Sequence, residues 1–303
     1  MKLAQEFRRK SVYSIAVMFD RLFNYLPRPL ALFAGSWLGL LAYKIVTRDQ
    51  IRMFRHLSIA YENSLSANEK ISIGRTFYIS SGRNIADLMR FSSSHSDEIL
   101  KVVDCSGLRY FDRAYNRGKG VLGITGHLGN FELLAAYLAK LGYKVGAIGR
   151  KLADSKLNNL LLKKRQKMGI VNFDSTEPPQ KIISWLRAGG AIGAAIDLDS
   201  TKLRSVFLPT FGRLSKVPAG QSIIAARTGA ALIPMVCVRT NLGRYQVIIK
   251  PEIPITYTYK GGSKVDIVRT TLDCHHVLEE LIDQYREQWI WMHNRWHTAP
   301  EAD

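Results

Sequence analysis

Apolar residues follow two different periods along the chain, and the change between them divides the sequence. Over residues 12–26, apolar side chains recur with the three- and four-residue spacing of an amphipathic helix. The sequence Pro-Arg-Pro at 27–29 ends this helix. Pro29 can begin a second helix, because the N–H groups of a first helical turn have no partners within the helix anyway. We therefore expect two consecutive helices near the amino terminus.

The second predicted helix begins with an apolar stretch, since no charged residue occurs between Leu30 and Tyr43. These fourteen residues are too few for a bilayer span, which needs about 20. Adding the next three reaches only the lower limit. Basic residues flank the stretch, and residues 1–55 carry ten Lys and Arg against three Asp and Glu. An apolar helix with basic flanks is typical of a segment that embeds in an anionic leaflet, although a buried core helix has the same pattern. We predict a membrane-associated helical segment over 1–60. Whether residues 30–46 span or only embed in the bilayer is left open.

Short β-like runs alternate with helical patterns in the rest of the chain, after a polar and helical region over 48–100. The runs cover 121–125, 145–149, 191–196, 231–239 and 245–249, and the helical patterns cover 131–140, 155–168, 178–188, 217–228 and 264–292. This alternation predicts an α/β fold, with a central, mostly parallel or mixed sheet that helices flank. We expect one α/β domain over 61–303, with ligands bound beyond the carboxyl ends of its strands.

The charge balance narrows the class of partner. The 303 residues carry 43 Lys and Arg against 25 Asp and Glu, a formal net charge of +18. Such a surface favours nucleic acid, anionic lipid headgroups or an acidic protein. The basic residues gather around an apolar segment and no nucleic-acid-binding motif occurs, so we expect an anionic membrane surface and no nucleic acid.

Cysteine and histidine spacing gives no sign of a metal. The three cysteines are far apart and include no Cys-x-x-Cys, which predicts neither a disulfide framework nor a zinc finger. His275 and His276, with Asp273 nearby, are the one cluster to consider as ligands. Adjacent histidines rarely face one site, so we expect no metal.

The candidate chemistry lies in residues 121–138, VLGITGHLGNFELLAAYL. His127 directly follows the first clear strand, where a parallel sheet binds its ligands. Gly126 and Gly129 on either side allow a tight turn and a close approach of the backbone to a ligand. No serine or cysteine occurs in a nucleophile elbow. A base without a protein nucleophile indicates that the substrate supplies the nucleophile, a hydroxyl that attacks an activated acyl group.

Glu132 is the expected partner of this histidine. Asn130 is a candidate N-cap, which places Glu132 in the first turn of the next helix. We expect Glu132 to bond one ring nitrogen of His127 and leave the other free to accept a proton. The alternative is that Glu132 only interacts favourably with the helix dipole. Spacing does not decide, because His275 and Glu280 repeat it within a predicted helix.

The stretch GHLGNFELL resembles the catalytic motif of the lysophospholipid acyltransferase superfamily, a His followed after four residues by Asp or Glu. More narrowly, it is similar to the late lauroyl and myristoyl transferases of lipid A biosynthesis. Three further blocks of that family follow in the expected order, over 149–170, 192–239 and 285–300. The resemblance covers most of the chain beyond about residue 105, and a short apolar amino-terminal helix is also a family trait.

The resemblance implies a glycerol-3-phosphate-acyltransferase-like fold at the cytoplasmic side of the inner membrane. It implies transfer of a fatty acyl group from acyl carrier protein, or from acyl-CoA, to a hydroxyl of a lipid A precursor, without a cofactor. His127 would be the general base and Glu132 would orient it. The remaining residues that we expect near the oxyanion or the substrate are Gly129, Asn130, Arg150, Asp197 and Arg213. Arg295 and Trp296 are further candidates for contact with a headgroup.

Two departures from the family pattern bear on the acceptor. Leu198 stands between Asp197 and Asp199 where the family usually has Gln, and Thr210 stands where it usually has Phe. An acyltransferase acting on another glycerolipid, aminolipid or glycolipid therefore stays open. A non-catalytic basic protein that binds membrane or nucleic acid is the alternative from a different class.

Overall fold

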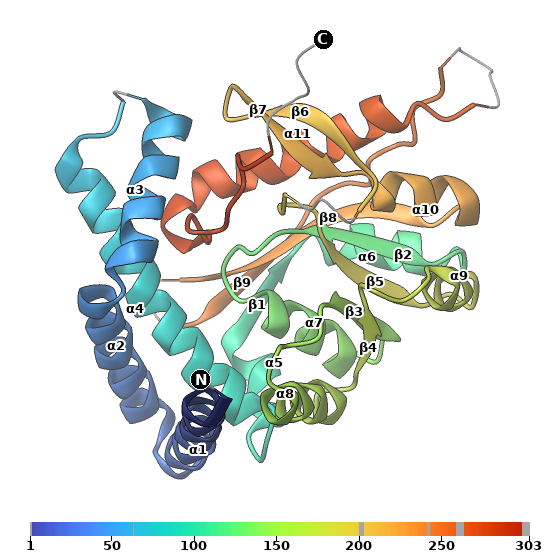
Figure 1. Ribbon diagram of the computed structural model, residues 1–303. Helices are drawn as coiled ribbons and strands as arrows, with labels where there is room; N and C mark the ends of the chain where they lie inside the picture. Colours follow the sequence, from blue (N-terminus) through green and yellow to red (C-terminus); the bar gives the residue numbers. More distant parts are fainter. Residues whose placement is uncertain (1, 63, 200–202, 241–242, 259–263, 299–303) are drawn as a thin grey trace.

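The computed structural model describes residues 2–62, 64–199, 203–240, 243–258 and 264–298. Four helices open the chain and lie along one side of an α/β region (Figure 1): α1 (Lys2–Tyr25), α2 (Arg28–Ile45), α3 (Thr47–Tyr61) and α4 (Ala67–Phe91). Pro29 lies in the first turn of α2, as the sequence predicts. The boundary near residue 60 stays a prediction, and α4, which follows it, packs on α2.

Glycines bring α2 and α4 into direct backbone contact. A Cβ added at Gly39 would lie 2.1 Å from the carbonyl oxygen of Tyr78, and one added at Gly82 would lie 2.0 Å from the carbonyl oxygen of Gly35. Small residues four apart on a helix permit this approach, as they do between helices within membranes. The contact buries the glycine face of α2 and leaves its bulky apolar residues on the outside.

The outer faces of α1 and α2 are apolar and exposed. The large side chains on them are Val12, Ile15, Met18, Leu22, Leu30, Phe33, Trp37, Leu41 and Ile45. Among the described residues, no single helix is both long and apolar enough to span a membrane. α2 and α3 meet both criteria only as a pair, and the chain bends by 85° between them.

The α/β region is built on a mixed, mostly parallel sheet of seven strands, which confirms the predicted class. Its strands are β1 (Val103–Ser106), β2 (Val121–Thr125), β3 (Val145–Gly149), β4 (Ile170–Asp174), β5 (Ala191–Ala195), β8 (Ala231–Arg239) and β9 (Tyr245–Ile249). Their order is β1-β9-β8-β2-β5-β3-β4, and only the β8–β9 pair is antiparallel. A separate antiparallel hairpin joins β6 (Ser205–Thr210) to β7 (Arg213–Pro218).

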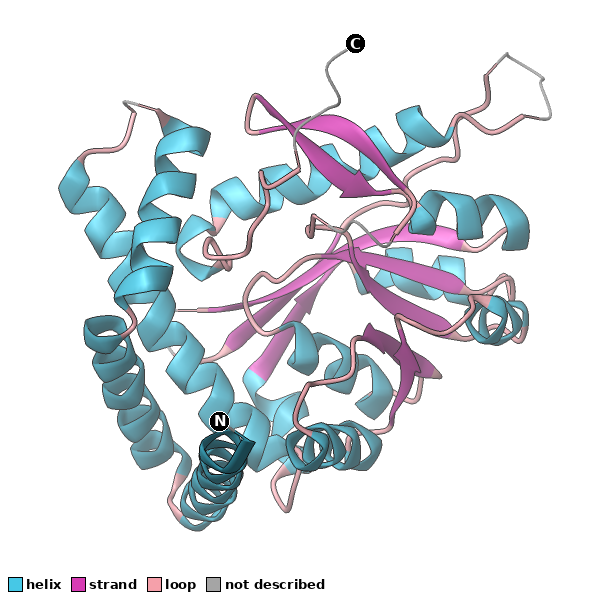
Figure 2. Cartoon of the chain, in the orientation of Figure 1, coloured by secondary structure: helices cyan, strands magenta, loops and turns pink. Residues whose placement is uncertain are grey.

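Helices cover both faces of this sheet (Figure 2). One core lies beneath α9 (Gln180–Arg187), α10 (Gly220–Thr228) and α11 (Ile267–Gln284). The other lies beneath α5 (Ile99–Val102), α6 (Leu108–Tyr115) and α7 (Phe131–Lys140). The remaining elements are α8 (Ser155–Lys167) beside β4 and the short 3-10 helices η1 (Ser96–Glu98) and η2 (Arg286–Gln288). Continuous apolar strands such as β8, which is buried along its whole length, need this cover on both sides.

The structure corrects two predicted helices. The pattern over 217–228 starts too early, because residues up to Pro218 belong to β7. The pattern over 264–292 runs too far, because α11 ends at Gln284. The residues after it leave the helix and lie at the carboxyl ends of the central strands, beside His127 and Asp197.

Candidate active site

His127 and Asp197 meet because two neighbouring parallel strands end at the same level. Thr125 of β2 pairs with Ala195 of β5, and each polar residue comes two positions later. The backbone N–H of His127 donates to Oδ2 of Asp197 at 2.8 Å, and the ring Nδ1 lies 2.8 Å from Oδ1. The carboxylate therefore fixes both the loop and the imidazole of His127.

Asp197 is fully buried, and Trp289 and Arg295 from the carboxyl-terminal segment hold it in place. The indole N–H of Trp289 donates to Oδ2 at 2.8 Å, and Nη2 of Arg295 lies 3.5 Å from the same oxygen. The guanidinium of Arg295 also stacks over the Trp289 ring, 4.0 Å from its centroid. Burial alone would raise the pKa of Asp197, but the charges of His127 and Arg295 and these hydrogen bonds hold it well below its usual range. Asp197 is therefore a carboxylate.

The rest of the His127 ring lies between two aromatic rings. Its centroid is 5.2 Å from that of Phe131 and 4.7 Å from that of His293. Burial and the nearby His127 charge lower the pKa of His293 to about 4, so His293 is neutral near pH 7. The side chain of His127 is 19% exposed. With Nδ1–H directed at a carboxylate, Nε2 carries the lone pair, and no described residue bonds to it.

The structure does not bring Glu132 to the ring of His127, where the sequence predicted it. Glu132 binds Arg165 of α8 instead, with Nε of the arginine 2.9 Å from Oε2. Phe131 is the residue of α7 that faces the His127 ring, and the next residue of a helix points about 100° further round. Arg165 also contacts Asn172 of β4, so Glu132 attaches α7 to α8 and β4.

Gly129 and Asn130 shape the loop and do not offer free amides. The N–H of Gly129 donates to the carbonyl of Gln288 at 3.0 Å, and the N–H of Asn130 donates to the carbonyl of Cys237 at 2.7 Å. Asn130 caps α7 as predicted, because its side chain accepts a bond from Leu133 N–H. Their backbone amides are thus already paired, which argues against the expected contact with an oxyanion or substrate.

Gly129 needs to be glycine for a steric reason. Its φ is +63°, and an added Cβ would lie 2.1 Å from the Cys237 carbonyl oxygen. Asn84 of α4 supports the same loop by donating to the Gly129 carbonyl at 3.2 Å. The side-chain oxygen of Asn84 in turn accepts a bond from Arg239 at the end of β8.

The segment after α11 closes the site. Ile290 N–H donates to the His127 carbonyl at 3.2 Å, and Leu128 forms an antiparallel bridge with Trp289. After the short helix η2, this segment is drawn as loop in Figure 2. Sequence reasoning missed Trp289 and His293 as site residues. It placed Arg295 at a headgroup, whereas the structure buries it against Asp197.

Two predicted arginines are exposed. Arg150 follows β3, at the same edge of the sheet as His127 because β2 and β3 run in the same direction. Arg213 begins β7, at the turn of the β6–β7 hairpin. Neither makes a hydrogen bond or ion pair with a described residue in the structure, and their roles stay predictions.

His275 is part of the packing between α11 and the hairpin. Its Nε2 lies 2.8 Å from the hydroxyl of Thr210. Burial lowers the pKa of His275 to about 4, so it is neutral near pH 7. Within the described part of the chain, no group of three or more His, Cys, Asp or Glu side chains is placed to hold a metal ion.

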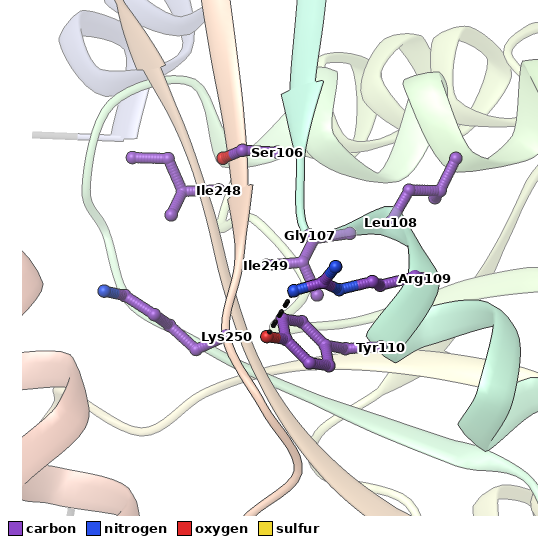
Figure 3. Close-up of a pocket in the computed structure, with 8 residues that line it drawn as sticks. All are labelled: Ser106, Gly107, Leu108, Arg109, Tyr110, Ile248, Ile249 and Lys250. Atoms are coloured by element: carbon purple, nitrogen blue, oxygen red, sulfur yellow. Dashed lines mark hydrogen bonds between the residues drawn. The ribbon is translucent and has the colours of Figure 1, made fainter.

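A cavity of about 400 Å³ lies away from His127, between the ends of β1 and β9 and the start of α6 (Figure 3). Arg109 and Lys250 line it. β1 and β9 run against the direction of β8 and β2, so their carboxyl ends lie at the opposite edge of the sheet from His127. This cavity is therefore separate from the candidate active site.

Comparison with known proteins identifies the family. The model of the bacterial lipid A biosynthesis acyltransferase family matches residues 1–298. The chain belongs to this family. It is similar to the lipid A biosynthesis palmitoleoyltransferase of Escherichia coli (strain K12), with 23% identity over 289 residues, 93% of this chain and 90% of that protein. It is also similar to the lipid A biosynthesis lauroyltransferase of the same strain, with 24% identity over 284 residues, 91% and 88% of the two chains.

A relative outside lipid A biosynthesis matches a shorter part of the chain. The phosphatidylinositol mannoside acyltransferase of Mycobacterium tuberculosis (strain ATCC 25618 / H37Rv) is 24% identical over 162 residues, 52% of this chain and 51% of that protein. Family membership shows that the protein is an acyltransferase, as the sequence predicts.

Proposed function

We propose that the protein transfers a fatty acyl group from acyl carrier protein to a hydroxyl of a lipid A precursor, with His127 as general base and Asp197 as its orienting carboxylate. The pairing of these two side chains, at 2.8 Å, is the observation that carries the proposal. Membership in the lipid A acyltransferase family supports the reaction type, since hydroxyl acylation from a thioester needs a base and no protein nucleophile.

The proposed step moves one proton twice. Nε2 of His127 takes the proton of the acceptor hydroxyl as its oxygen attacks the thioester carbonyl. The tetrahedral intermediate then collapses, the C–S bond breaks, and the imidazolium returns the proton to the thiolate. A positioned base contributes about 10²–10⁴ in rate to such a step.

Asp197 stabilises the charged form of His127 between these two transfers. Its negative charge lies beside the imidazolium, and Trp289 and Arg295 keep the carboxylate ionised and in place. Glu132 has a structural role in this proposal, because its partner is Arg165.

Charge supports the choice of donor and acceptor. Acyl carrier protein is acidic and lipid A precursors carry phosphates, so a chain with a net charge of +18 attracts both. Arg150 lies at the correct edge of the sheet to meet the oxyanion, and Arg213 is exposed and suited to a phosphate. We propose that the apolar face of α1 and α2 holds the enzyme on the cytoplasmic side of the inner membrane.

A product analysis tests the function. The purified protein is incubated with a lipid A precursor and a mixed pool of acyl carrier protein thioesters, and the product mass is read. One added acyl chain per acceptor is the expected result, and it disappears in His127→Ala. Acylation only with acyl-CoA would overturn the proposed donor.

A second acceptor class is included because of the mannoside acyltransferase relative. Parallel reactions contain a glycerolipid, an aminolipid and a glycolipid in place of the lipid A precursor. Faster transfer to any of these would replace the acceptor while leaving the His127 and Asp197 chemistry intact. No transfer to any acceptor from either donor would contradict catalysis altogether.

A further inference from the structure

A second cavity opens on the side of the molecule that carries the exposed apolar helices. It has a volume of about 480 Å³ and lies between α2, α4 and the β8–β9 turn at Gly243. Phe33 and Trp37 of α2 form one wall, and both are more than half exposed, at 64% and 59%. The cavity is thus continuous with the apolar face of α1 and α2.

Arg83 of α4 places a fixed positive charge in this cavity. Its Nε donates to the hydroxyl of Ser36 at 2.6 Å, and that hydroxyl donates to the carbonyl of Leu32 at 2.7 Å. Among the residues that the structure describes, no carboxylate lies within 4.0 Å of the guanidinium and neither Nη atom has a hydrogen-bond partner. Two bond-forming nitrogens therefore remain available inside the cavity.

The two neighbouring arginines, in contrast to Arg83, have a counter-ion. Arg28 and Arg239 both pair with the buried carboxylate of Asp87, at 2.9 and 2.7 Å. Burial and the like charge of Arg239 lower the pKa of Arg83, but an arginine remains protonated at neutral pH. An anion in the cavity would balance a charge that the described residues leave without a counter-ion.

We propose that this cavity binds the phosphate headgroup of an anionic membrane phospholipid, with the Arg83 fork on the phosphate oxygens and the acyl chains against Phe33 and Trp37. The guanidinium fork fits phosphate oxygens. Aromatic side chains are favoured at the depth of lipid headgroups, where α2 would place these two. A soluble phosphate would make no use of the apolar wall, so the cavity fits a lipid better.

This site is distinct from the candidate active site. Asn84, the next residue of α4, contacts the loop of His127, whereas Arg83 faces α2. The inference rests on the proposed membrane association but not on acyl transfer. Its test therefore measures lipid binding without any acyl donor.

Trp37 supplies the signal. Vesicles of phosphatidylcholine, with or without 30% phosphatidylglycerol, carry bromine on their acyl chains and quench nearby tryptophans. Subtracting the fluorescence of Trp37→Phe from that of the wild type isolates the contribution of Trp37. Trp289 and Trp291 are buried, each only 1% exposed. We expect stronger quenching of Trp37 by the phosphatidylglycerol vesicles. Equal quenching by both compositions in the wild-type protein would overturn recognition of the anion without the need for any arginine variant.

Arg83→Gln tests the contact itself, and Arg227→Gln is its matched control. Arg227 is an exposed arginine on α10, on the far side of the molecule from α2 (Figure 1). Arg83→Gln should weaken binding to phosphatidylglycerol vesicles about fivefold, the effect of one basic residue near a membrane surface. Arg227→Gln should leave binding unchanged. Equal effects of the two variants would show that net charge alone matters and would overturn the site.

Two further arms separate the other outcomes. Millimolar inorganic phosphate that abolishes the Arg83-dependent binding would make the ligand a free phosphate and overturn the lipid assignment. A wild-type protein that floats with no vesicle of either composition would contradict membrane association, and the lipid site with it. Arg83→Lys keeps a charge but lacks the fork, so we expect binding between that of wild type and Arg83→Gln.

Discussion

Replacing Asp197 with Asn removes one charge at the centre of the site and changes the side-chain volume little. In the structure, Nδ1 of His127 lies 2.8 Å from Oδ1 of Asp197, and the Asp197 side chain is fully buried. Two unit charges whose centres are about 4 Å apart interact by about 4 kcal/mol at an effective dielectric constant of 20. Since about 1.36 kcal/mol corresponds to one decade in rate, losing this stabilisation of the imidazolium should lower kcat about 10³-fold.

Single-turnover acyl transfer, with the product read by mass spectrometry, measures this change apart from product release. Glu132→Gln is a matched control, because it also removes a largely buried carboxylate that pairs with an arginine but does not contact His127. Both variants should lose stability, so a thermal unfolding curve of each gives the fraction of folded protein by which its rate is corrected. The reasoning would be refuted by a Glu132→Gln rate that falls 10³-fold while Asp197→Asn stays near wild type.

Three other outcomes follow from the packing and the buried charges. Folding lowers the pKa of His275 from 6.5 to about 4, so between these pH values the unfolded state binds a proton that the folded state does not. The unfolding free energy should therefore decrease as the pH falls from 6.5 to 4. When the unfolding free energy from denaturant titrations is plotted against pH, its slope in this range should be shallower by about 1.4 kcal/mol per pH unit in His275→Gln than in the wild type. Gly39→Ala should lower the unfolding free energy by about 1–3 kcal/mol, because the added Cβ would overlap the backbone of α4. Gly220→Ala should not lower it, because its Cβ would meet nothing within 4 Å. Equal melting temperatures of the two variants would contradict this. Arg165→Gln should lower the unfolding free energy by about 3–5 kcal/mol, because it leaves the largely buried Glu132 unpaired. Adding Glu132→Gln should restore part of the stability, and differential scanning calorimetry of the single and double variants checks this.

Hydrophobic patterning predicted the central strands because those strands are buried on both faces. β2, β3, β8 and β9 have the predicted bounds, since each is a continuous or alternating apolar run between glycines or polar turns. β1 and β4 carry polar residues at the sheet edge, and β6 and β7 contain prolines in a hairpin away from the main core. Such strands depend on their neighbours for stability, and local sequence indicates them poorly.

The position of His127 could be predicted from the sequence, but its contact with Asp197 could not. His127 follows a clear strand, so its position at the sheet edge could be inferred. Asp197 comes from a strand 70 residues later, and its contact depends on the β2–β5 register, which sequence spacing along one segment does not contain. Trp289 and Arg295 lie in irregular chain whose path is fixed only by tertiary contacts.

The dependence of Asp197 on Trp289 and Arg295 sets an order of events during synthesis. The ribosome has made His127, Asp197 and the whole central sheet well before residue 295 leaves its exit tunnel. A nascent chain at that stage contains His127 and Asp197 but lacks the indole and guanidinium that keep the Asp197 carboxylate in place. Acyl transfer should therefore require synthesis past Arg295, and a stop codon placed before codon 289 should silence the enzyme, because Asp197 then lacks both partners.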